Sequence, residues 1–461
     1  MDTITVSKVD DVHIRLTCNR GLLQEVADHF TFRVPGAEFM PAYKNKMWDG
    51  YIRLLNVNTR ILYYGLLPYL GDFCRSRNYE LIEDETIDCA VSLSVAEAKE
   101  FIKSLNLKHT PRDYQVKAFV DAARNRRQLI LSPTASGKSL IAYLCVRWWE
   151  QLYDQETERT LIIVPTVSLV HQLASDFLEY SGGSWGHDEI HKISAGAEKT
   201  SDDVRKHVYI TTWQSIYKQR KPYFKNFRVV IGDEAHLFQA KSLISILTKL
   251  ENCPHRIGMT GTLDGTTTHK LILEGLFGQV KKTITTKELI DRKQLAEFEI
   301  KCLVLKYPVE DCKAIKRHKY HEEISFLASH ERRNKFIRNL TVSLEGNTLL
   351  LFKLVEKHGK ILHSMIEEKL GAETTRRVFF VYGGTDAETR EEIRAITELE
   401  TNAIIVASYG TFSTGINIVN LHNIIFASPS KSRIRNLQSI GRGLRKGENK
   451  TKAVLYDIAD D

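Results

Sequence analysis

The sequence lacks any uninterrupted apolar run of the roughly 18 residues that a membrane-spanning helix needs. Its first ten residues include Asp2 and Asp10 and no apolar core, so we expect no secretory signal there. Cysteine is scarce: seven residues, never spaced C-x-x-C, predict reduced cytosolic thiols instead of disulfides or a zinc site. There is no low-complexity tract or short tandem repeat, and hydrophobic (43%) and charged (26%) fractions are ordinary for globular proteins, which excludes a disordered, collagen-like or coiled-coil chain.

The length of 461 residues predicts about three domains at roughly 150 residues each. Charge is distributed unevenly along the chain. Residues 1–100 hold 11 basic and 15 acidic side chains, residues 101–300 hold 28 and 22, and residues 301–461 hold 26 and 20. The basic excess of the last two-thirds fits a chain that follows a phosphate backbone. The alternative is that an excess of six charges over each segment is ordinary for a globular protein.

The hydrophobic pattern divides the chain into four parts. Residues 1–90 mix period-two strands with short helices, which predicts a small α+β module, and residues 91–109 are expected to form a connecting helix. From residue 110 onward, apolar runs without polar alternation are separated by helical segments, which is typical of a parallel sheet covered on both faces. Because the pattern restarts near residue 300, we predict an α/β fold with two parallel-sheet lobes, at 110–295 and 296–461.

A phosphate-binding loop is predicted at residues 132–139, whose sequence is Ser-Pro-Thr-Ala-Ser-Gly-Lys-Ser. The segment follows a strand at 129–131 and precedes a helix, which is the context that such a loop requires. Backbone N–H groups and the helix N-terminus would hold the β-phosphate of ATP, Lys138 would reach the β- and γ-oxygens, and Ser139 would ligate Mg²⁺. Ser132 stands where the general pattern has glycine. The loop residues expected to contact the nucleotide are Thr134, Ala135, Ser136, Gly137, Lys138 and Ser139.

Two carboxylates end a second apolar strand, at Asp233 and Glu234. In a Mg²⁺-dependent nucleotide hydrolase, Asp233 would hold the metal and Glu234 would orient and deprotonate the attacking water. The alternative is a helix N-cap, which is common for acidic residues at a strand end. The presence of Lys138 in the same lobe disfavours that alternative.

Together these motifs resemble the superfamily 2 DExH/DEAH helicases and translocases, with His236 completing Asp-Glu-Ala-His. The resemblance covers residues 110–457 and implies RecA-like lobes, ATP and Mg²⁺ as cofactors, and nucleic-acid unwinding. Further motifs follow in the family's order, and the resemblance implies a role for each. For the nucleotide it implies contacts to the adenine from Arg112 and Gln115, a further contact from Gly415, and catalysis by Gln438, Arg442 and Arg445. It implies that residues 259–262 couple hydrolysis to movement and that nucleic acid is contacted by Pro165, Thr166, Thr211, Thr212, Gln214, Thr411 and Thr414.

Arg442 and Arg445 are three residues apart, so a helix would place both on one face, from which they could reach one γ-phosphate. Hydrolysis would then depend on lobe closure. The alternative is a merely solvated basic face. Two positions depart from the family. Asn417 stands where aspartate is common, so the nucleotide contact of that position is not carried over to it. Thr260-Gly261-Thr262 replaces Ser-Ala-Thr, which is more similar to DNA repair and restriction motors.

The N-terminal module is similar to that of T4-type phage helicases, at residues 39–41 and 44–51. The resemblance implies branch migration, fork regression and R-loop unwinding in recombination, repair and replication. We further expect a monomer in the host cytoplasm that binds branched or forked DNA. Its partners would include the RNA strand of R-loops and would not include a membrane. Lys44, Lys46 and Trp48 combine cations with an aromatic ring, a pattern that suits DNA contact. The alternative is that Trp48 and Tyr51 belong to the core of a small domain.

Three other functions remain open on the sequence. The chain could be an RNA helicase of the same superfamily, or a motor that moves along duplex DNA without separating strands. It could also be a nucleotide-binding switch that is no motor, although the predicted motifs of the second lobe speak against that.

Overall fold

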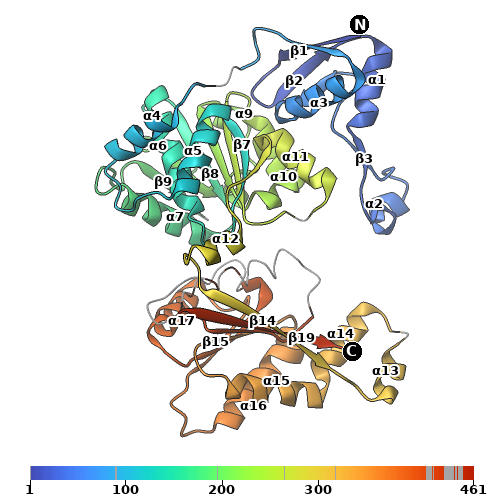
Figure 1. Cartoon of the computed structure of the whole chain (residues 1–461), viewed down its shortest axis with the longest axis vertical. Helices are drawn as coiled ribbons and strands as arrows, with labels where there is room; N and C mark the ends of the chain where they lie inside the picture. The colour runs from blue at the N-terminus through green and yellow to red at the C-terminus, as the bar shows by residue number, and fades with distance from the viewer. Residues whose placement is uncertain are drawn as a thin grey trace. The chain divides into compact units, whose positions relative to one another are not determined.

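The computed structural model of the chain describes all residues except 1, 89–90, 195, 264, 317, 412–417, 419, 430–440, 442–443 and 445–449. The chain divides into two compact units, one of residues 1–132 and 137–283, the other of residues 133–136 and 284–461. Each unit contains one large sheet in which every strand is parallel to its neighbours (Figure 1). The predicted α/β class with two parallel-sheet lobes and a small α+β module is therefore confirmed. In the described part of the chain, no helix is both long and apolar enough to cross a membrane.

The N-terminal module contains a four-stranded sheet in the order β5-β2-β1-β6, in which only the β1–β6 pair is parallel. The predicted alternation is visible in β1, where Ile4 and Val6 are buried and their neighbours are partly exposed. A separate two-stranded antiparallel pair, β3–β4, leads to α2. The elements are β1 Thr3–Lys8, β2 His13–Thr17, α1 Arg20–His29, β3 Thr31–Arg33, η1 Ala37–Phe39, α2 Pro41–Lys44, β4 Tyr51–Arg53, β5 Ile61–Tyr63, η2 Tyr64–Leu66, α3 Leu67–Arg77 and β6 Glu80–Glu83.

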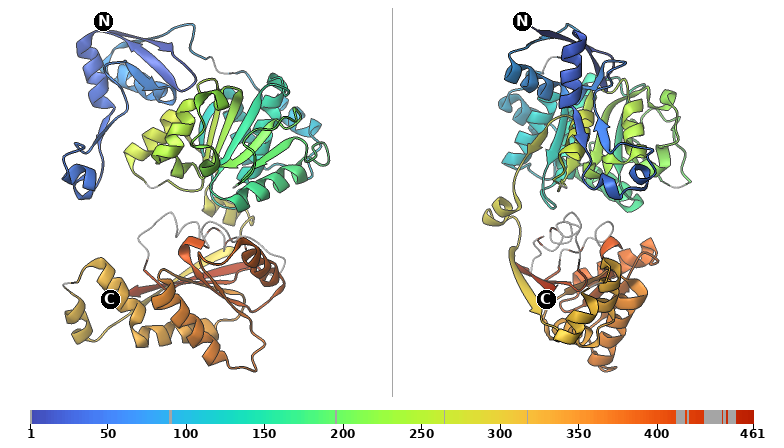
Figure 2. Two further views of the ribbon diagram at one scale, coloured as in Figure 1. Left: turned by 180° about the vertical axis from the view of Figure 1, so that it is seen from behind. Right: turned by 90° about the vertical axis from the view of Figure 1, so that its right-hand side faces the viewer.

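The first lobe is built on a seven-stranded sheet in the order β13-β7-β12-β11-β8-β10-β9, with helices on both faces (Figures 1 and 2). Its helices are α4 Val95–Ser104, α5 Asp113–Asn125, α6 Lys138–Trp149, η3 Glu150–Leu152, α7 Val167–Tyr180, α8 Trp213–Ile216, α9 Lys221–Phe224, η4 Ala235–Gln239, α10 Lys241–Lys249 and α11 Thr267–Phe277. Its strands are β7 Arg127–Leu131, β8 Arg159–Val164, β9 Ile190–Ile193, β10 Val208–Thr212, β11 Phe227–Asp233, β12 His255–Thr260 and β13 Val280–Lys282.

The second lobe has a six-stranded sheet in the order β14-β19-β18-β15-β17-β16. Its described strands are β14 Glu297–Leu305, β15 Thr348–Phe352, β16 Val378–Val381, β17 Ile404–Ser408, β18 Asn423–Phe426 and β19 Lys452–Asp460. Its described helices are α12 Thr286–Asp291, α13 Val309–Ile315, α14 Tyr320–Ser329, α15 Glu331–Ser343, the π-helix η5 Val355–Gly359, α16 Lys360–Leu370 and α17 Ala387–Leu399.

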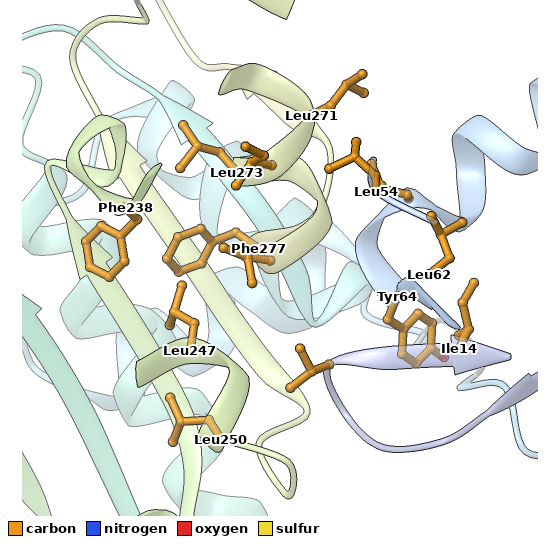
Figure 3. Packing of buried hydrophobic residues seen from close by; sticks show 14 of the residues in the cluster. Ile14, Leu54, Leu62, Tyr64, Phe238, Leu247, Leu250, Leu271, Leu273 and Phe277 are labelled. Carbon is orange, nitrogen blue, oxygen red and sulfur yellow. The ribbon is translucent and has the colours of Figure 1, made fainter. Parts of the chain in front are cut away.

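The sheet of the first lobe is buried on both faces. Leu129 belongs to one hydrophobic cluster and its neighbour Ile130 to another, because successive side chains of a strand point to opposite faces. The cluster that contains Leu129 continues into the N-terminal module, and Figure 3 shows Leu54 of the module next to Leu271 of α11. One core therefore joins the module and the first lobe.

Some boundaries differ from the sequence analysis. The helix expected over 91–109 is shorter, since α4 spans Val95–Ser104, and the two units divide at 283/284 whereas the sequence pattern placed the division after residue 295. The apolar pattern predicts no strand at β12, because Gly258 interrupts the run there. Side chains of Leu129 and Phe277 occupy the space where a Cβ of Gly258 would lie, so this glycine permits close packing.

Candidate nucleotide and nucleic-acid site

Strand order brings the predicted motifs of the first lobe to one edge of its sheet. In a parallel sheet the carboxyl ends of all strands meet at the same edge, where ligands of open α/β sheets bind. The phosphate-binding loop follows β7, the coupling motif ends β12, and Asp233 ends β11. The two predicted nucleic-acid segments follow β8 and end β10. Because the order is β7-β12-β11-β8-β10, the nucleotide motifs are grouped on three adjacent strands and the nucleic-acid motifs on the next two.

The first residue of the loop is held by two neighbours. The backbone N–H of Ser132 donates to the carbonyl of Thr260, at 2.9 Å. The hydroxyl of Thr283 lies 2.8 Å from the Ser132 hydroxyl and donates to it. Ser132 is buried, so the serine that replaces the usual glycine has a bonded side chain. Thr283 is 151 positions away in the sequence, and no sequence signal identified it.

Gly137 and Gln115 meet at the end of the loop. Gly137 has a left-handed backbone (φ 77°), and a Cβ there would overlap Nε2 of Gln115. That Nε2 donates to the Gly137 carbonyl at 3.3 Å, and Oε1 of Gln115 accepts from the backbone N–H of Arg112 at 2.8 Å. The guanidinium of Arg112 donates to the hydroxyl of Tyr114 at 3.0 Å. The structure therefore brings together Gln115, Arg112 and Gly137, the last loop residue before α6.

Lys138 and the two carboxylates form the charged part of this edge. Lys138 begins α6 and its Nζ donates to the Ser132 carbonyl at 3.2 Å. Glu234 has a left-handed backbone (φ 49°), which is uncommon for a residue with a side chain and is frequent at functional sites. Burial and the neighbouring Glu234 raise the pKa of Asp233 above its usual range, while the positive charge of Lys138 acts in the opposite direction.

The acidic motif is connected to the coupling motif by a side-chain bridge. Nδ1 of His236 lies 3.0 Å from the hydroxyl of Thr260 and 3.3 Å from Oε2 of Glu234. The Thr260 hydroxyl donates to the carbonyl of Thr262 at 2.9 Å. His236 thus contacts both the general-base candidate and the strand that ends next to it.

The residues that would hold Mg²⁺ provide oxygen atoms, which this cation prefers. Oδ1 of Asp233 is buried and accepts no hydrogen bond from the residues that the structure describes, so it is available to a cation. The Ser139 hydroxyl lies 2.8 Å from the hydroxyl of Tyr180, a partner that the sequence did not indicate. Among the described residues there is no cluster of three or more histidine, cysteine and acidic side chains that could hold a metal without the nucleotide.

The predicted nucleic-acid residues of the first lobe differ in accessibility. Thr166 caps α7 by accepting from the Leu169 N–H, and Gln214 is exposed. Thr211 and Thr212 are buried: the hydroxyl of Thr211 donates to the Thr212 carbonyl, and that of Thr212 lies 3.1 Å from Ser215. Pro165 is partly exposed at the end of β8.

In the second lobe, the buried hydroxyl of Thr411 lies 2.7 Å from that of Ser408, at the carboxyl end of β17. The other predicted residues of this lobe lie outside the described residues: Thr414, Gly415, Gln438, Arg442 and Arg445. In the N-terminal module, Lys44 and Lys46 are exposed. Trp48 is partly exposed, and its indole N–H donates to the Tyr51 carbonyl at 2.8 Å, so neither the stacking nor the core hypothesis accounts for it completely.

Comparison with protein families identifies three matching segments. Residues 3–84 match the family model "DNA helicase UvsW, N-terminal", residues 108–265 match "Type III restriction enzyme, res subunit", and residues 331–447 match "Helicase conserved C-terminal domain". Among curated proteins, the chain is 36% identical to the ATP-dependent DNA helicase UvsW of Enterobacteria phage T4, over 98% of this chain and 89% of the relative. It is also 25% identical to the DNA 3'-5' translocase XPB2 of Sulfurisphaera tokodaii, over 75% of this chain and 81% of that protein.

Solved structures give the same result. The crystal structure of T4 UvsW matches all of this chain and 91% of its own chain, with a TM-score of 0.55 and 35% identity. A fragment of an HsdR subunit of a type I restriction enzyme from Vibrio vulnificus matches 88% of this chain and 71% of its own, with a TM-score of 0.58. At 19% identity, that second likeness shows the fold alone.

Proposed function

The chain belongs to the UvsW family of superfamily 2 helicases, and from this premise we propose that it is an ATP-dependent DNA helicase that remodels branched DNA by branch migration, fork regression and R-loop unwinding. The observation that carries the proposal is the order of the motifs on one sheet edge, where the nucleotide residues adjoin the predicted DNA residues. ATP hydrolysis on β7, β12 and β11 can thus act on DNA held beside β8 and β10 without a separate transmission domain. We place the protein in the host cytoplasm as a monomer.

The nucleotide edge supports a specific division of labour. The loop Thr134–Gly137 offers backbone N–H groups to the phosphates, and Lys138 neutralises the β- and γ-oxygens. Bound Mg²⁺, held by Asp233 and Ser139, would supply positive charge to the transferring phosphoryl group. Glu234 orients the attacking water and accepts its proton.

The remaining site residues complete the cycle. Gln115 and Arg112 hold the adenine, and Gly415 contacts the nucleotide. His236 connects Glu234 with Thr260, so a change at the phosphate reaches the end of β12. By family resemblance, Gln438, Arg442 and Arg445 of the second lobe stabilise the transition state, and arginines in this role are worth on the order of 10³–10⁵ in rate.

DNA contacts are proposed for both lobes and the N-terminal module. In the first lobe they involve the end of β8 and the exposed Gln214, with Thr211 and Thr212 holding the backbone shape. Thr411 and Thr414 contribute from the second lobe, and Lys44, Lys46 and Trp48 from the module. Within an R-loop the partner strand would be RNA.

A steady-state ATPase assay at one fixed salt concentration tests the proposal, with single strands, duplex, forks, four-way junctions and R-loops as cofactors. We expect DNA to stimulate hydrolysis and Lys138→Ala or Glu234→Gln to abolish it, while the exposed-site controls Lys99→Ala and Glu83→Gln behave as wild type. Arg445→Ala should retain ATP binding and lose hydrolysis. ATPase activity that ignores every nucleic acid would refute the helicase and favour a nucleotide switch.

Two further outcomes separate the motor alternatives. Preferential unwinding of matched RNA forks would indicate an RNA helicase. Displacement of a triplex strand without fork unwinding would indicate a duplex translocase.

A further inference from the structure

The N-terminal module carries an arm that lies outside its four-stranded sheet. The arm comprises residues 31–53: the β3–β4 pair forms its stem, and η1 and α2 form its tip. Figure 1 shows α2 at the end of this arm, beyond α1 and apart from the four-stranded sheet. The arm is therefore an appendage of the module and no part of the module's sheet.

The arm tip is folded, so its surface is a defined one. Ala37 and Val34 are buried within it, and the Val34 N–H donates to the Gly50 carbonyl at 2.9 Å. Gly50 has φ 83°, and a Cβ there would lie 3.1 Å from the Cβ of Ala37 and 3.2 Å from the Tyr43 ring. This glycine lets the two sides of the tip pack closely.

Despite that packing, two large apolar side chains face solvent. Phe39 is 75% exposed and Met47 is 77% exposed, one on each side of α2 in the sequence. Beside Met47 is an open hollow of about 620 Å³, lined by Glu38, Tyr43, Lys44, Lys46, Met47, Trp48 and Asp49. Its volume is in the range of small-ligand sites, which is about 300–1,000 Å³. Aromatic and apolar side chains, two lysines and two carboxylates therefore line an open hollow whose volume is large enough for a nucleotide.

Charge identifies the chemistry of the partner. The arm contains four basic and two acidic residues, whereas the rest of residues 1–90 contains six basic and eleven acidic ones. Arg33 pairs with Glu38 at 3.7 Å and Arg53 with Asp49 at 2.5 Å. Lys44 and Lys46 form no ion pair with any residue that the structure describes, so their charge is available to a phosphate. The arm as a whole is therefore net +2, while the rest of residues 1–90 is net −5. That contrast, together with the two exposed lysines, favours a polyanion over an ordinary protein surface.

We propose that the arm tip captures an unpaired nucleotide at a DNA branch point, through the surface formed by Phe39, Lys44, Lys46, Met47 and Trp48. The base packs against Met47 and the Trp48 ring, whose plane the hydrogen bond to Tyr51 fixes, and the lysines contact the flanking phosphates. Phe39 acts as an apolar wedge against the neighbouring base pair. This inference rests on the proposed helicase function and names the element that selects branched DNA.

The apolar contacts are tested with Phe39→Ser/Met47→Ser in the full chain, using a four-way junction with 2-aminopurine at the branch. Binding of wild type should raise the 2-aminopurine fluorescence, because the base leaves its stack. The variant should lose that rise and bind the junction about tenfold more weakly, within the range of about 5- to 150-fold that stacking one base implies. Its affinity for linear duplex and its ATPase rate with single strands should not change. Leu152→Ser, which replaces an exposed apolar residue of the first lobe, should behave as wild type.

The phosphate contacts are tested with Lys44→Gln/Lys46→Gln. Two lost phosphate contacts should reduce the slope of log affinity against log salt for the junction by about 1.8. The control Lys99→Gln/Lys103→Gln, on exposed lysines of α4, should leave the slope unchanged.

The outcomes separate this inference from the proposed function. Wild type without DNA-stimulated ATPase would refute the helicase itself. With an active wild type, arm variants that bind and unwind junctions normally would overturn the arm proposal and leave the tip to a protein partner. Equal losses on single strands, duplex and junctions would also overturn it, since the arm would then not select branches. Unchanged thermal midpoints would show that the variants fold.

Discussion

The hydroxyl of Tyr69, on α3 of the N-terminal module, donates a hydrogen bond of 2.7 Å to Oε2 of Glu274, on α11 of the first lobe. Glu274 is buried, and its Oε1 accepts from the backbone N–H of Val280 at 2.8 Å. Close by, the guanidinium carbon of Arg127, at the start of β7, lies 4.2 Å from the ring centre of Tyr64. The module is thus attached to α11 and β7, and β7 leads directly into the phosphate-binding loop.

The Tyr69–Glu274 bond should stabilise this attachment measurably. Tyr69→Phe leaves a buried carboxylate oxygen without its donor, so we expect a loss of about 1–3 kcal/mol in the free energy of unfolding. A double-mutant cycle with Glu274→Gln, followed by urea denaturation, isolates the pair. A coupling energy indistinguishable from zero would show that the bond contributes nothing to docking.

Gly65 should tolerate no side chain, because a Cβ there would collide with the backbone carbonyls of Glu274 and Gly275. We expect Gly65→Ala to cost about 1–3 kcal/mol or more through forced separation of the module from α11. Gly71→Ala is the matched control on α3, where the nearest atom is the flexible end of Arg75 and alanine should stabilise the helix by about 0.5–1 kcal/mol. Thermal unfolding of both variants checks the difference, and equal midpoints would contradict it.

His207 should make the stability of the first lobe depend on pH. Its Nε2 lies 2.6 Å from Oε1 of Glu150 and its Nδ1 lies 2.8 Å from the Arg205 carbonyl, so both nitrogens face acceptors. Burial alone lowers the pKa of His207, but the hydrogen bond and negative charge of Glu150 outweigh it and raise the pKa above 6.5. The protonated histidine therefore contributes its full stabilisation below pH 6.5, which is about the pKa of histidine in the unfolded chain. That contribution is lost as the pH rises through the higher pKa of the folded state.

Urea unfolding at several pH values above 6 measures this effect. Wild type should lose more stability across that window than His207→Gln, which cannot be protonated. If the unfolding free energies of the two proteins changed with pH in the same way, His207 would not be the cause of the pH dependence.

Thr260 should be needed for coupling more than for hydrolysis. Thr260→Val removes the hydroxyl that contacts His236, while Lys138, Asp233 and Glu234 keep their positions. We expect single-strand-stimulated ATPase within a few-fold of wild type and a larger loss of fork unwinding, measured side by side. Thr248→Val is the control, since the Thr248 hydroxyl donates to the Ser245 carbonyl within α10, away from the motifs. Proportional loss of both activities would argue against a coupling role.

Local patterns predicted the components of the site well. The strand before Ser132, the loop at Lys138 and the carboxylates at Asp233 and Glu234 are contiguous signals, and the structure places them at one sheet edge. The partners of those residues were not predictable: Thr283 holds Ser132 from 151 positions away, and Tyr180 contacts Ser139 from 41 positions away. No periodicity encodes such pairs, because they depend on which helices and strands become neighbours.

By itself the sequence determined the α/β class, the nucleotide loop and the family, because hydrophobic periodicity and motif spacing depend on residues close together in the chain. Only the tertiary structure decided that the module shares a core with the first lobe and that Phe39 and Met47 remain exposed on a folded arm. Composition cannot distinguish an apolar side chain that becomes buried from one that remains exposed. That outcome depends on long-range packing, in which Tyr69 and Glu274 meet across 205 positions.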